Sequence, residues 1–87
     1  QFSSQELNSY AWYAYENVEG SALLRQAIGW ALASVDKKSE YANNDTLAWL
    51  YFKMGDKENA LNIARKAIEM GKASGEDTSS TEELLKK

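Results

Sequence analysis

The chain contains two similar stretches, one after the other. Ala11-Trp12 recurs as Ala48-Trp49, 37 residues later. Further along each stretch, residues 26–31 resemble residues 59–64, now at a spacing of 33. The two spacings differ by four residues, about one helical turn, which we place between residues 19 and 24 of the first stretch. Two successive supersecondary units of nearly the same design are therefore expected.

Apolar side chains recur at helical intervals along most of the chain, and proline is absent. A chain without proline can be helical almost throughout, with breaks at glycine and at clusters of Ser, Asn and Asp. No long stretch alternates apolar with polar residues, so strands are not expected. The predicted fold class is all-α. Four long helices are predicted. The first two cover residues 3–18 and 21–36, the third begins between residues 42 and 45 and runs to about residue 54, and the fourth covers residues 56–73. A polar loop is predicted over residues 36–44, and a short helix from about residue 79.

The predicted helix ends carry residues that are typical of helix caps. Ser3 and Glu6 have the spacing of a capping box, in which each side chain bonds the other's free backbone N–H. Asp56 is the predicted N-cap of the fourth helix, and Gly75 is predicted to end that helix. Residues 79–83 offer two overlapping capping boxes for the last helix.

Cysteine and histidine are both absent, which narrows the chemistry open to the chain. It cannot form disulfides, thiolate zinc sites, or the Ser/His and Cys/His pairs of nucleophilic catalysis. We expect no catalytic residue, no cofactor and no metal site. An enzyme that uses carboxylates alone is a remote alternative. Its candidate acids, such as Glu82 and Glu83, stand at predicted helix starts, where acids stabilise the helix dipole.

The formal net charge is −3, and the 10 basic and 13 acidic residues are scattered along the chain. No basic stripe is interleaved with aromatics, so nucleic acid is not an expected partner. No apolar run approaches the ~18 residues of a transmembrane helix, so no membrane partner is expected. The chain begins with Gln1 rather than Met. This suggests a processed protein or an excised domain, from which a targeting signal could have been removed.

The second unit resembles the tetratricopeptide repeat (TPR), a helix–turn–helix with small residues at the helix crossing and Gly at the turn. The matching residues are Leu47, Ala48, Tyr51, Gly55, Ala60, Ala64 and Ala67. The resemblance implies two antiparallel helical hairpins in a right-handed superhelical stack over residues 1–75, with units at about 3–36 and 42–74. Residues 76–87 would form a C-terminal capping helix. The first unit departs from the pattern at Ser34, where the family has Ala, and Ser39 and Lys72 replace the family's Pro.

A second resemblance is to the C-terminal helical tail of bacterial thioredoxin-domain proteins. It is carried by residues 8–12, by residues 45–49, and by Gly75-Glu76-Asp77 followed by a Glu-Glu-Leu-Leu helix. Such tails follow a thiol-disulfide domain in exported proteins. The resemblance therefore implies a periplasmic or exported bacterial protein whose redox chemistry lies upstream of this chain.

The TPR resemblance also implies a concave surface lined by the first helix of each unit. Carried over residue by residue, that surface holds Gln5, Asn8, Trp12, Tyr15, Glu16, Asp45, Trp49, Phe52 and Lys53. Large aromatic rings with a few polar neighbours suit a peptide-binding hot spot. The alternative is that these rings are core. Capture of an anion is disfavoured because only Asn8 and Lys53 could bind it, so a basic or apolar peptide is expected.

Two local signals leave alternatives open. Residues 44–46 (Asn-Asp-Thr) fit the N-glycosylation triplet, but helix capping also explains them. Gly29 inside the second helix costs roughly 0.8–1 kcal/mol relative to Ala. Close approach of a neighbouring helix near Trp12 or Tyr13 would explain it, and simple tolerance is the other reading.

Three functions follow from these observations. The leading hypothesis is a protein–protein interaction module that binds a protein or peptide partner on the aromatic concave face. The second is a structural appendage that packs on an upstream, thioredoxin-like domain, and the third is the carboxylate enzyme. Tyr10 and Tyr13 lie off the main apolar stripe of the first helix. We therefore predict an apolar patch at the N-terminal end, covered by an upstream domain, a partner or a second copy in a weak homodimer.

Overall fold

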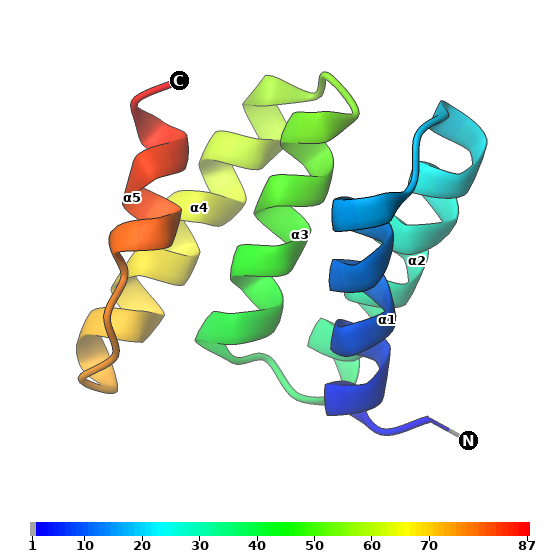
Figure 1. Ribbon diagram of the computed structural model, residues 1–87. Coiled ribbons are helices and arrows are strands. Elements are labelled where there is room, and N and C mark those ends of the chain that lie inside the picture. The colour runs from blue at the N-terminus through cyan, green and yellow to red at the C-terminus, as the bar shows by residue number, and fades with distance from the viewer. Residues whose placement is uncertain (1) are drawn as a thin grey trace.

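The computed structural model describes residues 2–87 and is built of α-helices (Figure 1). The helices are α1 (Ser4–Asn17), α2 (Ser21–Lys37), α3 (Tyr41–Lys53), α4 (Lys57–Ala73) and α5 (Ser79–Leu85). No strand occurs within the described range. The predicted all-α class is confirmed.

The helices form two layers, with α1, α3 and α5 in one and α2 and α4 behind them (Figure 1). Helix α1 packs along α2, and α3 packs along α4. The two pairs are joined by contacts of α3 with both α1 and α2, while α5 packs on α4 and α3. The molecule is a slab of 32 × 32 × 18 Å. Helices α1, α3 and α5 form one broad side of this slab.

Small side chains hold the helices together. Each core cluster consists mainly of alanine with a few leucines, which lets the helix backbones approach closely. The first cluster is Ala11, Ala14, Leu24, Ala27, Ala31, Leu47 and Leu50, and the second is Ala48, Ala60, Ala64 and Leu84. Partly buried aromatic and aliphatic side chains close the edges of both clusters.

The extra turn of the first unit lies where the two repeat spacings predict it. Both units have a three-residue connection between their helices, at residues 18–20 and 54–56. Helix α2 begins six residues before the buried Ala27, whereas α4 begins three residues before its counterpart Ala60. Most of the additional chain is therefore the first turn of α2, and the two units differ little elsewhere.

Several predicted helix ends are confirmed. Ser3 N–H donates to Glu6 Oε1 at 2.9 Å and Glu6 N–H donates to Ser3 Oγ at 3.1 Å, which is a complete capping box. Asp56 caps α4 through the Asn59 N–H at 3.2 Å. Helix α4 ends at Ala73, two residues before Gly75, whose φ of 77° is in the left-handed region that favours glycine.

The predicted loop over residues 36–44 is wrong, because helix occupies most of it. Helix α2 continues to Lys37 and α3 already begins at Tyr41. The Asn43 side chain makes this early start possible: its Oδ1 accepts from the Glu40 N–H at 2.9 Å and its Nδ2 donates to the Lys38 carbonyl at 2.7 Å. The asparagine side chains that suggest a polar loop in the sequence instead cap the start of α3 and are buried there.

Two further expectations are corrected at polar residues. Ser79 and Ser80 lie inside α5 rather than capping it; Thr78 holds the N-cap position, and Asp77 accepts from the Ser79 N–H at 3.0 Å. Asn44 is fully buried, and its Nδ2 donates to the Glu40 carbonyl at 2.7 Å. Its amide nitrogen is therefore inaccessible to glycosylation in the folded chain.

Gly29 is not explained by close packing, since a Cβ added there would meet nothing within 4 Å. The close-approach alternative is wrong. Gly71 has that role instead: a Cβ there would lie 2.4 Å from Thr78 Cγ2 and 3.0 Å from Tyr41 Cδ1. The α4–α5 loop and the start of α3 therefore both rest directly on the backbone of α4.

Helix α5 repeats the spacing that relates α1 to α3. Leu84 follows Leu47 by 37 residues, and Thr81 follows Asn44 by the same number. Leu47, Asn44, Leu84 and Thr81 are all buried. Helix α5 is thus a shortened version of the first helix of a unit, and it packs on the second unit as α3 packs on the first.

Candidate functional site

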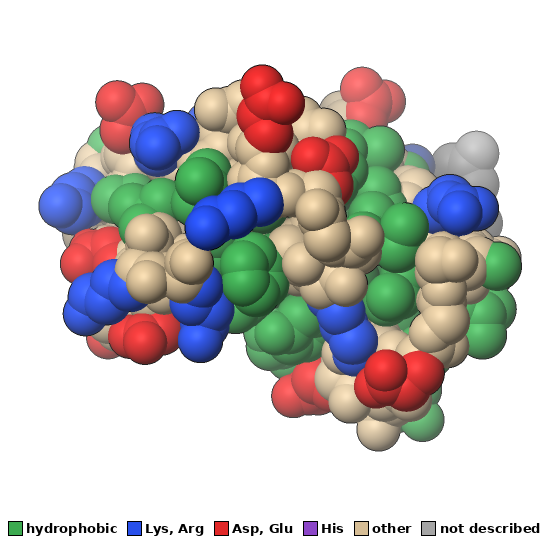
Figure 2. All heavy atoms as spheres, turned by 90° about the horizontal axis from the view of Figure 1, so that it is seen from above, with side chains coloured by type: hydrophobic (Ala, Val, Ile, Leu, Met, Phe, Trp, Pro, Cys, Tyr) green, Lys and Arg blue, Asp and Glu red, His purple; other side chains and the backbone are tan. Residues whose placement is uncertain are grey.

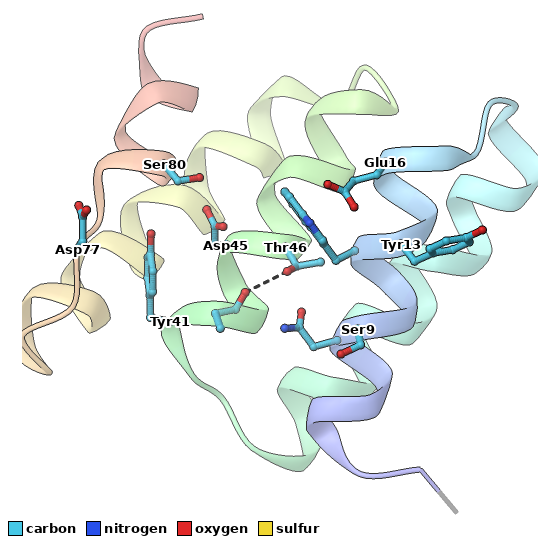
Figure 3. Close-up of a pocket in the computed structure, with 11 residues that line it drawn as sticks. Ser9, Tyr13, Glu16, Tyr41, Asp45, Thr46, Asp77 and Ser80 are labelled. Atoms are coloured by element: carbon cyan, nitrogen blue, oxygen red, sulfur yellow. Dashed lines mark hydrogen bonds between the residues drawn. The ribbon is translucent and has the colours of Figure 1, made fainter.

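A groove of about 560 Å³ crosses the layer of α1, α3 and α5 (Figure 3). One wall is α1, the floor is the first half of α3, and the opposite wall is the start of α5 with the loop before it. The groove is lined by Asn8, Ser9, Trp12, Tyr13, Glu16, Tyr41, Ala42, Asp45, Thr46, Asp77 and Ser80. An adjoining hollow of about 380 Å³ shares Asn8, Ser9 and Ala42 and extends the groove to Gln5.

The helical repeat explains why three α1 side chains meet in the groove. Asn8, Trp12 and Glu16 are spaced by four residues and so lie on one face of α1. Leu7, Ala11 and Ala14 occupy the neighbouring face and are buried against the rest of the molecule. Tyr13 stands at the rim, with its ring pointing away from α3 (Figure 3).

The opposite wall is held in place by a chain of hydroxyl groups between α3 and α5. Thr81 Oγ1 donates to Asp45 Oδ1 at 2.6 Å, which uses its only proton. The Tyr41 hydroxyl, 2.7 Å from Thr81 Oγ1, must therefore donate to it. Thr81 itself is fully buried. These two hydrogen bonds fix the position of α5 against α3 and so set the width of the groove.

Asp45 is the most constrained acid of the groove. Burial raises the pKa of its carboxyl above the ordinary value, and the hydrogen bond from Thr81 partly offsets that rise. The indole N–H of Trp49 faces the same carboxylate and also lowers its pKa, although it makes no hydrogen bond of ordinary geometry. Asp45 is consequently a carboxylate with partners on the protein side and its remaining acceptor capacity directed into the groove.

The acids give the groove a single sign of charge. Glu16, Asp45 and Asp77 come from three different segments, and no Lys or Arg occurs among the groove-lining residues given above. Hydrogen bonds from the Ser79 backbone N–H and hydroxyl lower the pKa of Asp77, so it is ionised at neutral pH. Outside the groove both signs are mixed: Figure 2 shows acidic and basic side chains interspersed on one face, with hydrophobic side chains between them.

The remaining predicted residues form an aromatic ladder beside the groove. Trp12 and Tyr15 are stacked, with ring centroids 4.8 Å apart and planes at 19°. Tyr15 meets Trp49 edge-on at 6.0 Å, and Trp49 meets Phe52 edge-on at 6.1 Å. The ladder connects α1 to α3, and Trp49 and Phe52 also pack on the second core cluster. Only Trp12 of these four rings lines the groove.

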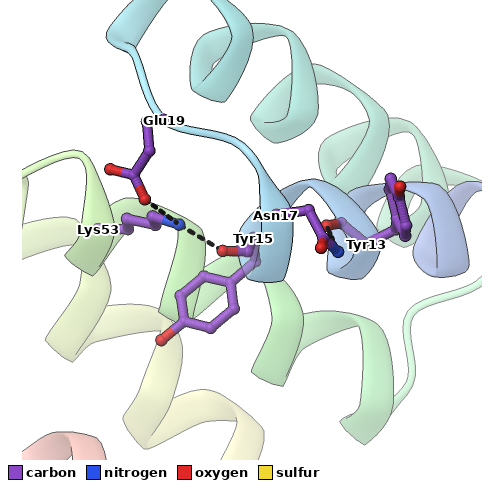
Figure 4. A network of polar contacts seen from close by, with 5 residues as sticks. All are labelled: Tyr13, Tyr15, Asn17, Glu19 and Lys53. Carbon is purple, nitrogen blue, oxygen red and sulfur yellow. Dashed lines mark hydrogen bonds and ion pairs between the residues drawn. The ribbon is translucent and has the colours of Figure 1, made fainter.

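The Lys53 ammonium contacts the C-terminal end of α1 and does not line the groove (Figure 4). Its Nζ donates a hydrogen bond to the backbone carbonyl of Tyr15, lies 5.2 Å from the centre of the Tyr15 ring, and is 3.8 Å from Glu19 Oε2. The Tyr15 carbonyl is one of the acceptors that a helix end leaves without an intrahelical partner. Lys53 therefore caps α1 and ties the two units together.

Four of the nine predicted residues line the groove, namely Asn8, Trp12, Glu16 and Asp45. Gln5 lines the adjoining hollow, whereas Tyr15, Trp49, Phe52 and Lys53 lie beside the groove. Sequence reasoning missed the contributions of the α3 start and of the α5 region, namely Tyr41, Ala42, Thr46, Asp77 and Ser80. The 37-residue spacing from Leu47 to Leu84 was the available signal, because it identifies α5 as a third helix of the same layer.

The groove offers acceptors rather than a reactive group. Its three carboxylates are acceptors, and Asn8 Oδ1 is buried beside them without a hydrogen-bond donor. In the part of the chain that the structure describes, no group of three or more metal-ligating side chains is placed to hold an ion. The arrangement can bind a donor-rich or cationic group and stack it on an aromatic wall.

No protein-family model matches the sequence, and no curated protein or solved structure is similar to it at a significant level. The five helices of residues 2–87 are each too short or too polar to cross a bilayer.

Proposed function

We propose that this chain is a non-catalytic protein-interaction module, and that its groove binds a partner segment carrying a Lys or Arg side chain. We also propose that its two helical hairpins stack in the right-handed manner of tetratricopeptide repeats. The observation that carries the first proposal is a groove with an aromatic wall and only negative charge. A carboxylate from each side and one from the floor surround a space of about 560 Å³.

The physical argument rests on complementarity. A lysine ammonium or arginine guanidinium has several donors and no acceptor, which suits a site whose charged groups are all carboxylates. Trp12 provides an aromatic ring beside them, on which a cation or an apolar side chain can stack. Anionic partners are disfavoured, because Lys53 is already bound to the Tyr15 carbonyl and to Glu19.

Selection from a random peptide library on the immobilised chain tests the proposal. Selected peptides should share a Lys or Arg next to an apolar or aromatic residue, and calorimetry should show binding that weakens with added salt. The double variant Glu16→Gln/Asp77→Asn keeps the shape of the groove and removes two charges. It should weaken binding of a selected peptide about tenfold, which corresponds to roughly 1.4 kcal/mol.

Glu69→Gln is the matched control. Glu69 is exposed on α4 and does not line the groove, so the change lowers the acidity of the protein without touching the site. Peptide binding should be unaffected by it. A selection that yields peptides without basic residues, or binding that survives the double variant, contradicts the proposal.

A second candidate function is that of a structural appendage of an upstream domain, as in an exported bacterial thioredoxin-like protein. The observation that favours it is the exposure of Phe2, Tyr10 and Tyr13 at the N-terminal end. Of these three rings only Tyr13 also lines the groove, at its rim. An upstream domain that packs on them would leave the rest of the groove open, so the two functions are compatible.

A further inference from the structure

The N-terminal face is the outer surface of the first hairpin, turned away from α3. We define it by Phe2, Tyr10, Tyr13, Leu23 and Trp30. Tyr10 and Tyr13 are 43% and 66% exposed, and Phe2 and Leu23 are also exposed. Phe2 meets Tyr10 edge-on at 5.2 Å, and Tyr10 meets Trp30 at 6.4 Å. Leu23 is seven residues before Trp30 and so lies on the same side of α2. Exposed apolar side chains gathered in this way mark an interaction surface.

The repeat identifies the residues of the second unit that correspond to Tyr10 and Tyr13. The 37-residue spacing pairs Tyr10 with Leu47, and Tyr13 with Leu50. Leu47 is 2% exposed and Leu50 is 0% exposed, and both belong to the core cluster formed with α1 and α2. The second unit therefore uses these positions to pack on the hairpin before it.

The second helices repeat this relationship. The 33-residue spacing pairs Trp30 of α2 with Ile63 of α4. Ile63 packs on the same core cluster that contains Leu47 and Leu50. Three members of the N-terminal face thus occupy positions at which the second unit contacts a preceding hairpin.

The opposite end of the molecule is already closed. Leu84 of α5, 37 residues after Leu47, is fully buried in the cluster of Ala48, Ala60 and Ala64. Helix α5 thus covers the surface that the second hairpin would offer to a following unit. A second copy cannot stack head to tail on the N-terminal face, because its own α3 and α5 cover both of the surfaces suited to it.

We infer that the N-terminal face binds an antiparallel helical hairpin from outside these 87 residues. That hairpin presents alanine and leucine side chains as α1–α2 presents them to α3. It seats on Tyr10, Tyr13 and Trp30 as the first hairpin seats on Leu47, Leu50 and Ile63. Of the residues that define this face, only Tyr13 also lines the groove, at its rim, so the hairpin site and the proposed peptide site adjoin at that one side chain.

An added hairpin tests the inference on the intact chain. Residues 3–39 are duplicated ahead of Ser3, which adds one 37-residue period and reuses the natural connection between units. The terminal copy carries Tyr10→Ser and Tyr13→Ser, which keep it soluble and distinguish its peptides by mass. Hydroxyl-radical footprinting of the inner Tyr10 and Tyr13 should fall several-fold relative to the parent chain. The extended chain should also unfold in one transition, with a larger denaturant m value.

A second version of the extended chain covers the case in which the tyrosine rings are too large to pack against the added hairpin. In it the inner Tyr10 and Tyr13 are changed to Leu, which matches Leu47 and Leu50. The inference is overturned if the first version shows no protection of the tyrosines and the second shows no increase in m value or midpoint. It is also overturned if footprinting of Tyr10 and Tyr13 in the parent chain falls with rising concentration as sedimentation shows a dimer. In that case a second copy is the occupant.

Discussion

The Thr81 hydroxyl in α5 donates a hydrogen bond to the Asp45 carboxylate in α3, at 2.6 Å. Thr81 is fully buried, and its oxygen is also 2.7 Å from the Tyr41 hydroxyl. One side chain of a seven-residue helix thereby satisfies two groups of α3. Because these bonds set where α5 lies, the width of the groove depends on a residue that does not line it.

Thr81→Val should destabilise the protein by about 1–3 kcal/mol at neutral pH. Valine has nearly the same shape but leaves Asp45 without its donor and Tyr41 without its acceptor. Chemical denaturation followed by circular dichroism measures the loss. Thr81→Ser keeps the hydroxyl and removes one methyl group, so it should cost clearly less. Equal losses for the two variants would show that the methyl, not the hydrogen bonds, matters.

The effect of Thr81→Val should also depend on pH. Burial holds the pKa of Asp45 above its ordinary value, so the native state binds more protons than the unfolded state between those two values. Stability from this group therefore falls as pH rises through that window. Without the Thr81 donor the pKa rises further, so the gap between the variant and the parent should widen with rising pH and narrow in acid. A gap that stays constant with pH would contradict this assignment.

Two glycines inside helices should respond in opposite directions to alanine. Gly29→Ala adds a Cβ in open space on an exposed part of α2, so helix propensity alone applies and stability should rise by about 0.4–1 kcal/mol. Gly71→Ala drives a Cβ to 2.4 Å from Thr78 Cγ2, and both Thr78 and Gly71 are buried. Overpacking of this kind costs about 1–3 kcal/mol. Thermal unfolding of the pair checks the signs, and a stabilising Gly71→Ala would refute the close contact.

Patterns within one helix were sufficient to predict most elements and part of the groove. The four-residue spacing of Asn8, Trp12 and Glu16 places them on one face of α1 in any helical arrangement. The capping box at Ser3 and the alanine positions of the core were predictable for the same reason, since each depends on local spacing. These features need no knowledge of how distant segments meet.

Features that depend on contacts between distant segments were not predictable. The polar residues at the start of α3 predict a loop, but in the structure they are buried by partners from other segments, such as Ser34, which Asn43 bonds at 3.0 Å. Asp77 and Ser80 reach the groove only because the loop after α4 folds back over Gly71. The sequence places Lys53 in the groove. In the structure it bonds instead to the Tyr15 carbonyl, which lies 38 residues away in the sequence.

Leu84→Ala should reveal how much α5 contributes to stability. Leu84 is fully buried against the second core cluster, so truncation should cost about 2–5 kcal/mol. Leu85 is 39% exposed, and Leu85→Ala is the matched control, with an expected cost well below that of Leu84→Ala. If α5 were only loosely attached, the two changes would have similar small effects on the denaturation midpoint. Hydrogen exchange of α4 amides should accelerate in Leu84→Ala, because α5 covers that helix.

Lys53→Met tests whether the lysine caps α1 or serves a ligand. Methionine retains the apolar stem over Tyr15 but removes the ammonium that bonds the Tyr15 carbonyl, so the free energy of unfolding should fall by about 1 kcal/mol. Glu19→Gln removes only the exposed partner, whose side chain is 94% accessible, and should leave stability unchanged within error. Amide exchange in the last turn of α1 should rise in Lys53→Met and not in Glu19→Gln. Because the ammonium is directed at α1 and not into the groove, binding of a basic peptide at the groove should survive the loss of Lys53. A variant that keeps its stability but loses peptide binding would return Lys53 to the binding surface.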